Sequence, residues 1–511
     1  MKKIKIIFLF LFILFGVFSL GVFTHVYAVG DIAGDMLTAN RLRDEGYLLV
    51  GHWSVWQFNH PGPFWFYYNR LFEIILTPFS FSRLQEWFIA SLLFNATVIT
   101  FSARSLSYYF FERWDFTFSI LFSFLLCSFS DSLSNLWMPY RIITPYLTFF
   151  ISLLLLTRGK FNYIFPAVFF ACILIHGYAI MPFFTLPFIF IAFLIGYKTE
   201  KNLKHFKAIF IASFLMALFF ASPIIIDFIL NQPDSNLNHL FSANQRMQNA
   251  EKPELFDILF IIFEQWITKG DSMHKYINYT FFFVFPLFFL FTFLSQKRGN
   301  LTKKDFDFCD FLKKSKVLLL FCFLIYATTI LYFKFRTPAP FIAYAINYLT
   351  ALPPLIFITI LTPFYHLAFL KQPHFKIKTA LILIFTSILF YSKPAPDSAV
   401  VFFENNAQSV ISTIQKEGFK TPLAISTDLT APMDFIINSV HMLLGVLVEF
   451  NEQGIAICLA QTADTSNITL TKKHRCPQNM PPEFLIIPPK NCGKNQPCLF
   501  KGDYFAMIKQ K

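Results

Sequence analysis

The chain has 511 residues, of which 55% are hydrophobic and only 14% are charged, and 73 of them are Phe. Several apolar runs reach the roughly 18 residues that mark a membrane-spanning helix, so the pattern predicts a polytopic helical membrane protein, and a spanning β-barrel, which needs alternating strands, is excluded. The formal net charge of +13 lies mainly in short loops between these runs, and no basic run is interleaved with stacking aromatics, so we exclude nucleic-acid binding.

The first apolar run follows a cationic start. Met1 to Lys5 is basic, and the apolar stretch extends from Ile6 to Ala28. A cleavable signal peptide is one interpretation, but its apolar core would exceed the usual ~7–15 residues, so we favour an uncleaved first span. In both cases residues from 30 onward face the outside.

A polar segment, "DIAGDMLTANRLRDEG" at 31–46, follows this run directly. Asp31 and Asp35 are four residues apart, so on a helix along the outer membrane surface both point to one face. These carboxylates are candidate catalytic groups. The structural alternative is that Asp31 is only the N-cap of this helix and that Asp35 belongs to a solvated face.

The next segment, "GHWSVWQFNHPGPFWFYYNRL" at 51–71, contains a tight Pro-Gly-Pro turn that starts a second, aromatic surface helix. Its aromatic residues form either an interfacial belt or a wall that holds a lipid chain beside a polar site. His60 and Arg70 are candidate ligands of an anion, although a lone His is more often structural. The candidate lining residues here are Trp65, Tyr67 and Tyr68.

A third segment, "SDSLSNLWMPYRIITPY" at 130–146, precedes another apolar run. Its Arg141 either extends its charge from the membrane boundary to water or faces a cavity and binds phosphate, for which the forked guanidinium is suited. Trp137 is a further candidate for lining the site.

The apolar runs predict about eleven transmembrane helices. The cations at both ends of 161–197 favour a hairpin of two spans there, and the remaining Lys and Arg then place the N-terminus and the loops 198–205, 296–316 and 371–378 in the cytoplasm. The predicted spans are 6–28, 87–103, 116–130, 142–156, 161–176, 178–197, 206–229, 280–294, 317–334, 349–370 and 379–392.

The tail from 393 to 511 is more polar and alternates expected helices with short strands, which predicts a small α/β domain. The sequence therefore predicts a transmembrane domain at 1–392, with outer loops at 29–86 and 230–279, and a C-terminal domain at 393–511 on the outer side.

Four of the eight cysteines lie in this tail. An oxidising periplasm permits two disulfides among them, with more than one possible pairing. A zinc site is the rival interpretation, but no C-x-x-C pair supports it. The four are Cys458, Cys476, Cys492 and Cys498.

The order of these segments resembles the GT-C superfamily of integral-membrane glycosyltransferases. The resemblance covers about the first 160 residues, and "NHPGP" with its aromatic helix is similar to bacterial protein mannosyltransferases and aminoarabinose transferases. It implies a bacterial inner-membrane enzyme, with a periplasmic C-terminal domain, that uses polyprenyl-phosphate sugars. It also implies an acidic catalytic residue at Asp31, or next at Asp35, and a donor-phosphate contact at His60.

The sequence departs from this family in one place. Many relatives have a second acidic residue in the next outer loop, often linked to a divalent metal such as Mg²⁺ or Mn²⁺. This chain has Asp131 some distance before that place and Arg141 near it. Metal dependence therefore stays open.

The expected reaction is transfer of a sugar, with inversion, to an envelope glycan, glycolipid or protein. A transporter or flippase of lipid-linked sugars is the first alternative, but ionisable residues are scarce within the spans and the outer loops are large. A membrane-anchored assembly protein is the second, but one span would be enough for an anchor.

Overall fold

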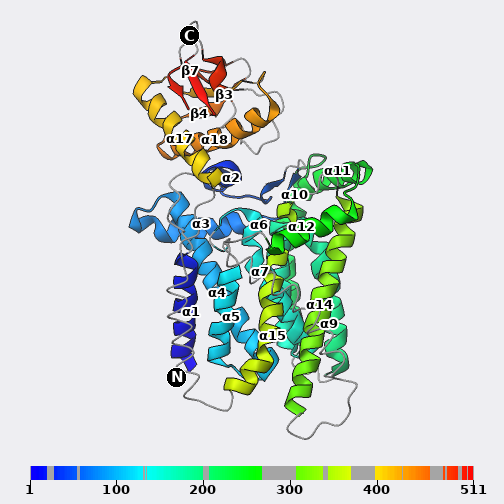
Figure 1. The fold of residues 1–511 in the computed structure, drawn as a ribbon. Helices are drawn as coiled ribbons and strands as arrows, with labels where there is room; N and C mark the ends of the chain where they lie inside the picture. Colours follow the sequence, from blue (N-terminus) through cyan, green and yellow to red (C-terminus); the bar gives the residue numbers. More distant parts are fainter. Residues whose placement is uncertain are drawn as a thin grey trace. The chain divides into compact units, whose positions relative to one another are not determined.

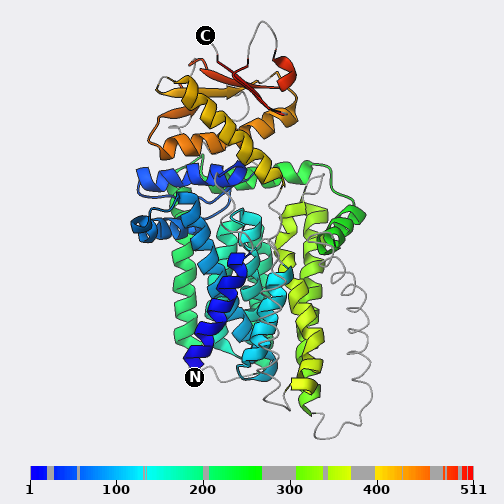
Figure 2. The same cartoon turned by 60° about the vertical axis from the view of Figure 1, so that its left-hand side comes forward.

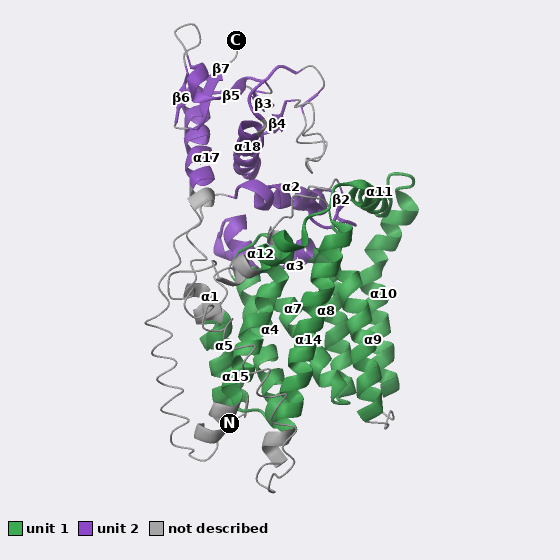
Figure 3. Ribbon diagram, turned by 45° about the vertical axis from the view of Figure 1, so that its right-hand side comes forward, with its two compact units in different colours: residues 1–20, 60–64, 89–393 green, residues 21–59, 65–88, 394–511 purple. Residues whose placement is uncertain are grey.

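A computed structural model gives the structure of the chain in two compact units. Unit 1 comprises residues 1–20, 60–64 and 89–393, and unit 2 comprises residues 21–59, 65–88 and 394–511 (Figure 3). The described residues are 2–19, 28–54, 58–129, 133, 135–199, 206–267, 306–337, 343–369, 398–419, 421–428, 430–460, 476–477, 480–492, 498–502 and 504–509.

Unit 1 is a bundle of helices, many of them long and apolar (Figure 1). Its elements are α1 (Lys2–Ser19), α4 (Arg83–Phe111, whose first residues belong to unit 2), α5 (Phe116–Phe129), α6 (Met138–Arg141), α7 (Ile143–Thr157), η2 (Phe161–Tyr163), α8 (Ile164–Gly177), α9 (Met181–Thr199), α10 (Phe206–Leu230), α11 (Asn236–Asn249), α12 (Leu255–Ile267), α14 (Phe306–Arg336), η4 (Ala343–Ala351) and α15 (Leu352–Phe369).

Helix α7 forms the centre of unit 1. All of its residues are buried, and it packs against α8, α9 and η4. A helix that is apolar on every side is expected to be enclosed in this way. Helix α10, by contrast, exposes many large apolar side chains, among them Phe219 and Leu230, as expected of a helix that faces lipid.

By length and composition, seven helical stretches in the described residues could cross a membrane, and two shorter apolar helices accompany them. One of the seven is α18 (Met433–Glu452), which belongs to unit 2 and packs against strands of its sheet. The predicted hairpin at 161–197 is present as α8 and α9, which contact each other. The predicted spans at 280–294 and 379–392 lie outside the described residues. The chain is therefore a multi-pass helical membrane protein, as its composition indicated.

Unit 2 combines the segment between α1 and α4 with the C-terminal tail. Its first elements are α2 (Gly30–Asp44), β1 (Trp53–Ser54), β2 (Phe58–Asn59), α3 (Phe64–Leu76) and η1 (Thr77–Phe79). The tail contributes α17 (Ser398–Glu417), β3 (Leu423–Thr427), α18 (Met433–Glu452), β4 (Ile457–Leu459), β5 (Phe484–Ile487), η7 (Pro489–Asn491), β6 (Phe500–Lys501) and β7 (Ala506–Lys509).

The tail folds into a mixed five-stranded sheet in the order β4-β3-β5-β7-β6. Strands β4, β3 and β5 are parallel, whereas β7 and β6 are antiparallel. Every residue of β3 is buried, as expected of a central parallel strand. Helices α17 and α18 pack against each other and against strands of this sheet (Figures 1 and 2).

This division differs from the predicted domains in one respect. The predicted transmembrane domain included residues 29–86, but most of that segment belongs to the same unit as the C-terminal tail. Helix α18 explains the difference, because it packs against α2 from the first segment as well as against its own sheet.

Candidate functional site

Helix α2 carries the two candidate catalytic aspartates. It begins at Gly30, and Val29 occupies the N-cap position. Asp31 therefore lies within the first turn, and the alternative that it is the N-cap is wrong. A carboxylate in the first turn interacts favourably with the helix dipole. Asp31 is exposed.

The middle of α2 is enclosed. Residues 33–40 are all buried, which covers every side of the helix over about two turns. The expectation that Asp35 belongs to a solvated face is therefore wrong. Asp31 and Asp35 come from one helix but are in opposite environments, since the first is exposed and the second is only 7% exposed.

Asp35 is paired with a residue that sequence analysis did not single out. Nδ1 of His52 lies 2.6 Å from Oδ2 of Asp35. His52 is 3% exposed, and its ring stacks on Phe66 at a centroid distance of 4.6 Å. The pairing could not be read from the sequence, because it depends on how the chain turns back between α2 and the β1–β2 hairpin.

A buried carboxylate, Glu73 of α3, gathers a cluster of cations. Its Oε1 accepts hydrogen bonds from Arg83 Nε (2.8 Å) and Trp87 Nε1 (2.7 Å). Its Oε2 accepts from Arg70 Nη1 (2.9 Å) and Arg43 Nε (3.1 Å). Burial raises the pKa of Glu73, but the charges of Arg83 and Arg43 outweigh burial and lower the pKa to about 2.

This cluster joins α2, α3 and α18 to the first residues of α4, all within unit 2. Arg83 of α4 also donates to Asn40 of α2 (2.7 Å), and its guanidinium lies 3.3 Å from Glu452 of α18. Arg70, a predicted phosphate ligand, is thus held by Glu73 inside a structural network. No sequence pattern indicates this network, because its members come from segments far apart in the chain.

His60, the predicted donor-phosphate contact, lies in unit 1. Its Nδ1 accepts a hydrogen bond from the backbone N–H of Ala179 (3.2 Å), and its ring lies 5.2 Å from that of Tyr178. Because Nδ1 is the acceptor, the ring proton resides on Nε2.

The turn after His60 is fixed by a second histidine, His176 of α8. Nδ1 of His176 accepts from the backbone N–H of Phe64 (3.3 Å), and Nε2 lies 2.8 Å from the carbonyl oxygen of Phe220. A Cβ atom at Gly62 would overlap the imidazole of His176. Glycine is therefore required at this position of the "NHPGP" motif because of close approach.

Arg141, the other predicted phosphate ligand, lies in the short helix α6 of unit 1. It is 2% exposed, so its side chain does not extend to solvent. Trp137 is the N-cap residue of α6. Its backbone N–H donates to Asn135 Oδ1 (2.8 Å), and its ring centroid lies 5.7 Å from that of Tyr140. A buried guanidinium in an apolar bundle requires charged or polar partners.

The aromatic residues of α3 do not form one continuous wall. Trp65 is buried and meets Tyr68 edge to face at 6.2 Å. Tyr67 is 42% exposed, and its hydroxyl accepts a hydrogen bond from the backbone N–H of Leu48 (3.1 Å). Only the exposed side of α3 is available to a lipid chain.

Among the residues that the structure describes, no three His, Cys, Asp or Glu side chains gather to hold a metal ion. Asp131, the acidic residue considered in relation to a metal, lies outside the described residues.

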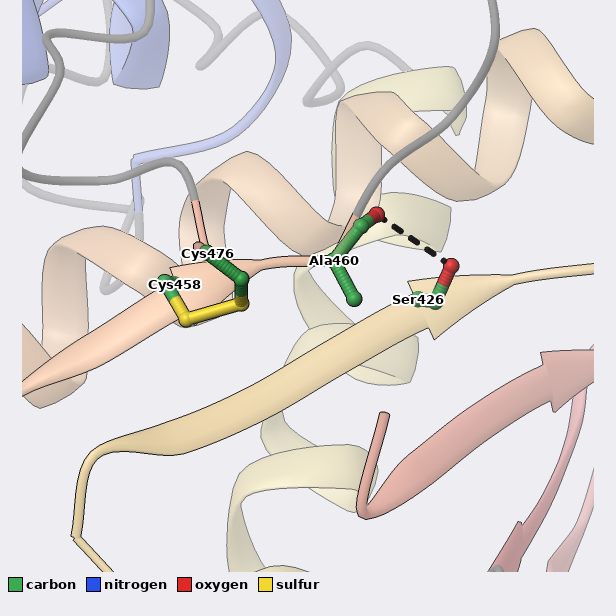
Figure 4. The surroundings of a disulfide bond; sticks show 4 residues. All are labelled: Ser426, Cys458, Ala460 and Cys476. Carbon is green, nitrogen blue, oxygen red and sulfur yellow. Dashed lines mark hydrogen bonds between the residues drawn. A yellow bond between two sulfur atoms is a disulfide. The ribbon is translucent and has the colours of Figure 1, made fainter. Parts of the chain in front are cut away.

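The four cysteines of the tail are paired. Cys458 of β4 bonds to Cys476, and Cys492 bonds to Cys498. The first disulfide lies on β4 at the position opposite Ala424 of β3, and two residues further along β3 Ser426 Oγ donates to the carbonyl oxygen of Ala460 (3.4 Å; Figure 4). It thus ties the segment after β4 back to the sheet.

These features define a multi-pass helical membrane protein with a small C-terminal sheet domain and a polar helix after its first apolar helix. No family model and no curated protein matches the sequence. Among solved structures, the chain is similar to ArnT from Cupriavidus metallidurans bound to undecaprenyl phosphate. The TM-score is 0.52 at 10% sequence identity, and the match covers 99% of this chain and 97% of ArnT.

A second solved structure is the archaeal oligosaccharyltransferase AglB from Archaeoglobus fulgidus, in complex with an inhibitory peptide and a dolichol-phosphate. The TM-score is 0.42 at 12% identity, over 96% of this chain and 70% of AglB. At such low identity the similarity to ArnT establishes the fold. The fold of this chain is therefore similar to that of an aminoarabinose transferase, as the resemblance of the first segments implied.

Proposed function

We propose that the protein is a GT-C-type glycosyltransferase that transfers a sugar from a polyprenyl-phosphate donor to an acceptor in the cell envelope. The observation that carries this proposal is similarity to ArnT over nearly the full length of both chains, because the solved ArnT structure binds undecaprenyl phosphate. The polar helix α2, which follows the first apolar helix directly, supplies the carboxylates that such a reaction needs.

In the proposed step, the acceptor hydroxyl oxygen attacks the anomeric carbon and gives its proton to a carboxylate. The bond from the anomeric carbon to the phosphate oxygen breaks, and polyprenyl phosphate leaves as an anion. A single in-line displacement inverts the anomeric centre. The leaving group is already a phosphate, so the reaction needs a base and stabilisation of the anion rather than a strong acid.

Asp31 is the better candidate for the base. It is exposed at the start of α2, whereas Asp35 is buried and paired with His52. A base must reach the proton that it removes, either directly or through one water, and only the exposed carboxylate meets that requirement in this conformation.

His60 and Arg141 are the proposed contacts of the donor phosphate. The hydrogen bond from the Ala179 N–H orients the ring of His60, and Arg141 supplies the positive charge. Arg70 is the weaker third candidate, because Glu73 already binds its guanidinium.

The proposal places the protein in a bacterial inner membrane, with its N-terminus in the cytoplasm and its C-terminal domain in the periplasm. The outer site gives the enzyme access to both a lipid-linked donor and an envelope glycan, glycolipid or protein. A divalent cation such as Mg²⁺ or Mn²⁺ could take part in the reaction. Measuring sugar transfer in the presence of EDTA, and again after each metal is restored, tests this.

The decisive experiment uses the purified full-length protein and a radiolabelled polyprenyl-phosphate sugar with envelope extract as acceptor. Transfer of label to a new product, with release of polyprenyl phosphate, supports the proposal. Movement of intact donor across vesicle membranes without such release indicates a flippase instead. Mass spectrometry of envelope glycans with and without the gene identifies the product.

A further inference from the structure

Helix α18 of the C-terminal domain has no solvent-facing side along much of its length. Residues 442–448 are all buried, and seven consecutive residues cover every side of a helix. Helix α18 packs against β3 and β4, against α17, and against α2. The sheet and α17 come from the same tail, but α2 comes from the beginning of the chain (Figure 1).

The two helices run side by side in the same direction. Near the start of α2, a Cβ atom at Gly30 would lie 3.9 Å from Cγ of His441, and one at Gly34 would lie 3.9 Å from Cδ1 of Leu444. At the other end, Arg43 lies 3.7 Å from Glu452. These three contacts follow one another in the same order along both helices, so α18 lies beside both ends of α2.

The closest approach is at Gly445. A Cβ atom there would lie 2.5 Å from the carbonyl oxygen of Ala28 and 3.2 Å from Cγ1 of Val29. The carbonyl is backbone and cannot rotate away as a flexible side chain can. The backbone of α18 therefore fits against the residues that lead into α2 only if position 445 has no side chain.

We propose that α18 is a positioning helix, which holds α2 in the place and orientation that present Asp31 to the acceptor. Gly445 is the residue on which this contact depends. The inference rests on the proposed function for the role of Asp31, and it assigns a task to the C-terminal domain that requires no contact with substrate. A base that is displaced by about 1 Å loses much of its effect, so a small shift of α2 is expected to slow transfer.

The test compares Gly445→Ala with Gly34→Ala in the full-length protein. Alanine favours helix over glycine at both positions, so helix propensity cannot cause a loss. Only the first substitution meets a backbone atom; the second makes an ordinary contact with Leu444. Two readouts are used: sugar transfer, and trypsin cleavage after Arg41 and Arg43 of α2, detected by mass spectrometry.

We expect Gly445→Ala to lower kcat by about 10-fold or more, to leave the KM for the polyprenyl-phosphate donor within about twofold, and to speed cleavage in α2. Gly34→Ala should match the wild type in both readouts. Unchanged cleavage in Gly445→Ala would show that α18 does not hold α2. Faster cleavage with normal turnover would show that the position of α2 does not limit catalysis.

The cleavage readout separates this inference from the proposed function. If the wild type transfers no sugar, the proposed function fails, but cleavage still decides whether α18 holds α2. If Gly445→Ala does not fold, the cysteine pair Gly34→Cys/Leu444→Cys replaces it. We expect mild oxidation to cross-link the pair while turnover stays within about twofold. A failure to cross-link, or a loss of turnover that reduction reverses, would overturn the proposal.

Discussion

At the scale of single residues, the two aspartates of α2 provide the sharpest test of catalysis. Asn resembles Asp in size and hydrogen bonding but is a very poor base. We expect Asp31→Asn to fold and insert normally while turnover falls by about 10²-fold or more. Asp35→Asn should instead weaken the packing of α2, because it replaces the charged partner of His52. Transfer rates and thermal unfolding of both variants separate the two effects.

Other outcomes would change this assignment. Full activity in Asp31→Asn, together with a loss in Asp35→Asn at unchanged thermal stability, would move the base one turn along the helix. Full activity in both variants would remove α2 from the chemistry.

Glu73 predicts a pH dependence of stability. Its pKa falls from the ordinary value of 4.5 to about 2 in the fold. The stabilisation is therefore complete above about pH 4.5 and is lost as the pH falls toward 2; its size is on the order of 3 kcal/mol. Glu73→Gln should destabilise the protein at pH 7, and the difference from wild type should shrink at pH 3. Thermal unfolding in detergent at both pH values measures it.

A matched control is Glu45→Gln. Glu45 pairs with Arg41 at 3.4 Å, but both side chains are well exposed, so the pair contributes at most about 1 kcal/mol. If the Glu45 and Glu73 variants lose equal amounts of stability, then burial and the charges of Arg43 and Arg83 do not make the Glu73 cluster stronger than an exposed ion pair.

Substitutions at Gly62 and His176 should have coupled effects on stability, because the two residues are in close contact. Gly62→Ala places a methyl group where the imidazole of His176 lies, so it should impair folding or donor binding. His176→Ala creates space but removes the partner of the Phe64 N–H. In a double-mutant cycle, the double variant should lose less stability than the sum of the two single losses, by roughly 0.5–3 kcal/mol in the free energy of unfolding. Additive losses would mean that the two positions do not meet.

At the scale of elements, the sequence predicted that helices alternate with short strands in the tail, but the edge strand β6 gives no such signal. Helix α18 and strands β3 and β5 have strong apolar patterns, whereas β6 has only two residues, Phe500 and Lys501. The sequence predicted that α2 is a helix, but it did not predict that the middle of this helix is buried. Its sequence is polar, and its enclosure comes from α18, about 400 positions later, which no local pattern reveals.

The disulfides belong to this scale because each closes a loop. Cys458–Cys476 spans 18 residues and Cys492–Cys498 spans 6. In the chain-entropy model the longer loop contributes about 1 kcal/mol more to stability. We therefore expect the paired Ser variant at 458 and 476 to lower the unfolding temperature more than the one at 492 and 498. Alkylation under denaturing, non-reducing conditions should leave all four cysteines unlabelled; labelling would show free thiols.

At the scale of the whole molecule, composition was enough to predict a multi-pass helical protein, because several long apolar runs in one chain are typical of membrane-spanning helices. The candidate site was harder. The "NHPGP" motif located His60 and the turn that requires Gly62. The contacts made by His52, His176 and Glu73 could not be predicted, because they join segments that are far apart in the chain. A single His in an apolar segment or a Glu in an amphipathic helix gives no signal by itself.

The last prediction concerns topology. Lys and Arg dominate the segments 198–205, 296–316 and 371–378, whereas the tail from 393 carries both signs of charge and four cysteines. The positive-inside rule places those loops in the cytoplasm, and the paired cysteines of the tail require an oxidising compartment. Reporter fusions at residue 305 and at the C-terminus should therefore report opposite compartments. Agreement between them would mean that the number of spans between these points is even, and the proposed periplasmic position of the C-terminal domain would have to be abandoned together with the orientation of α2.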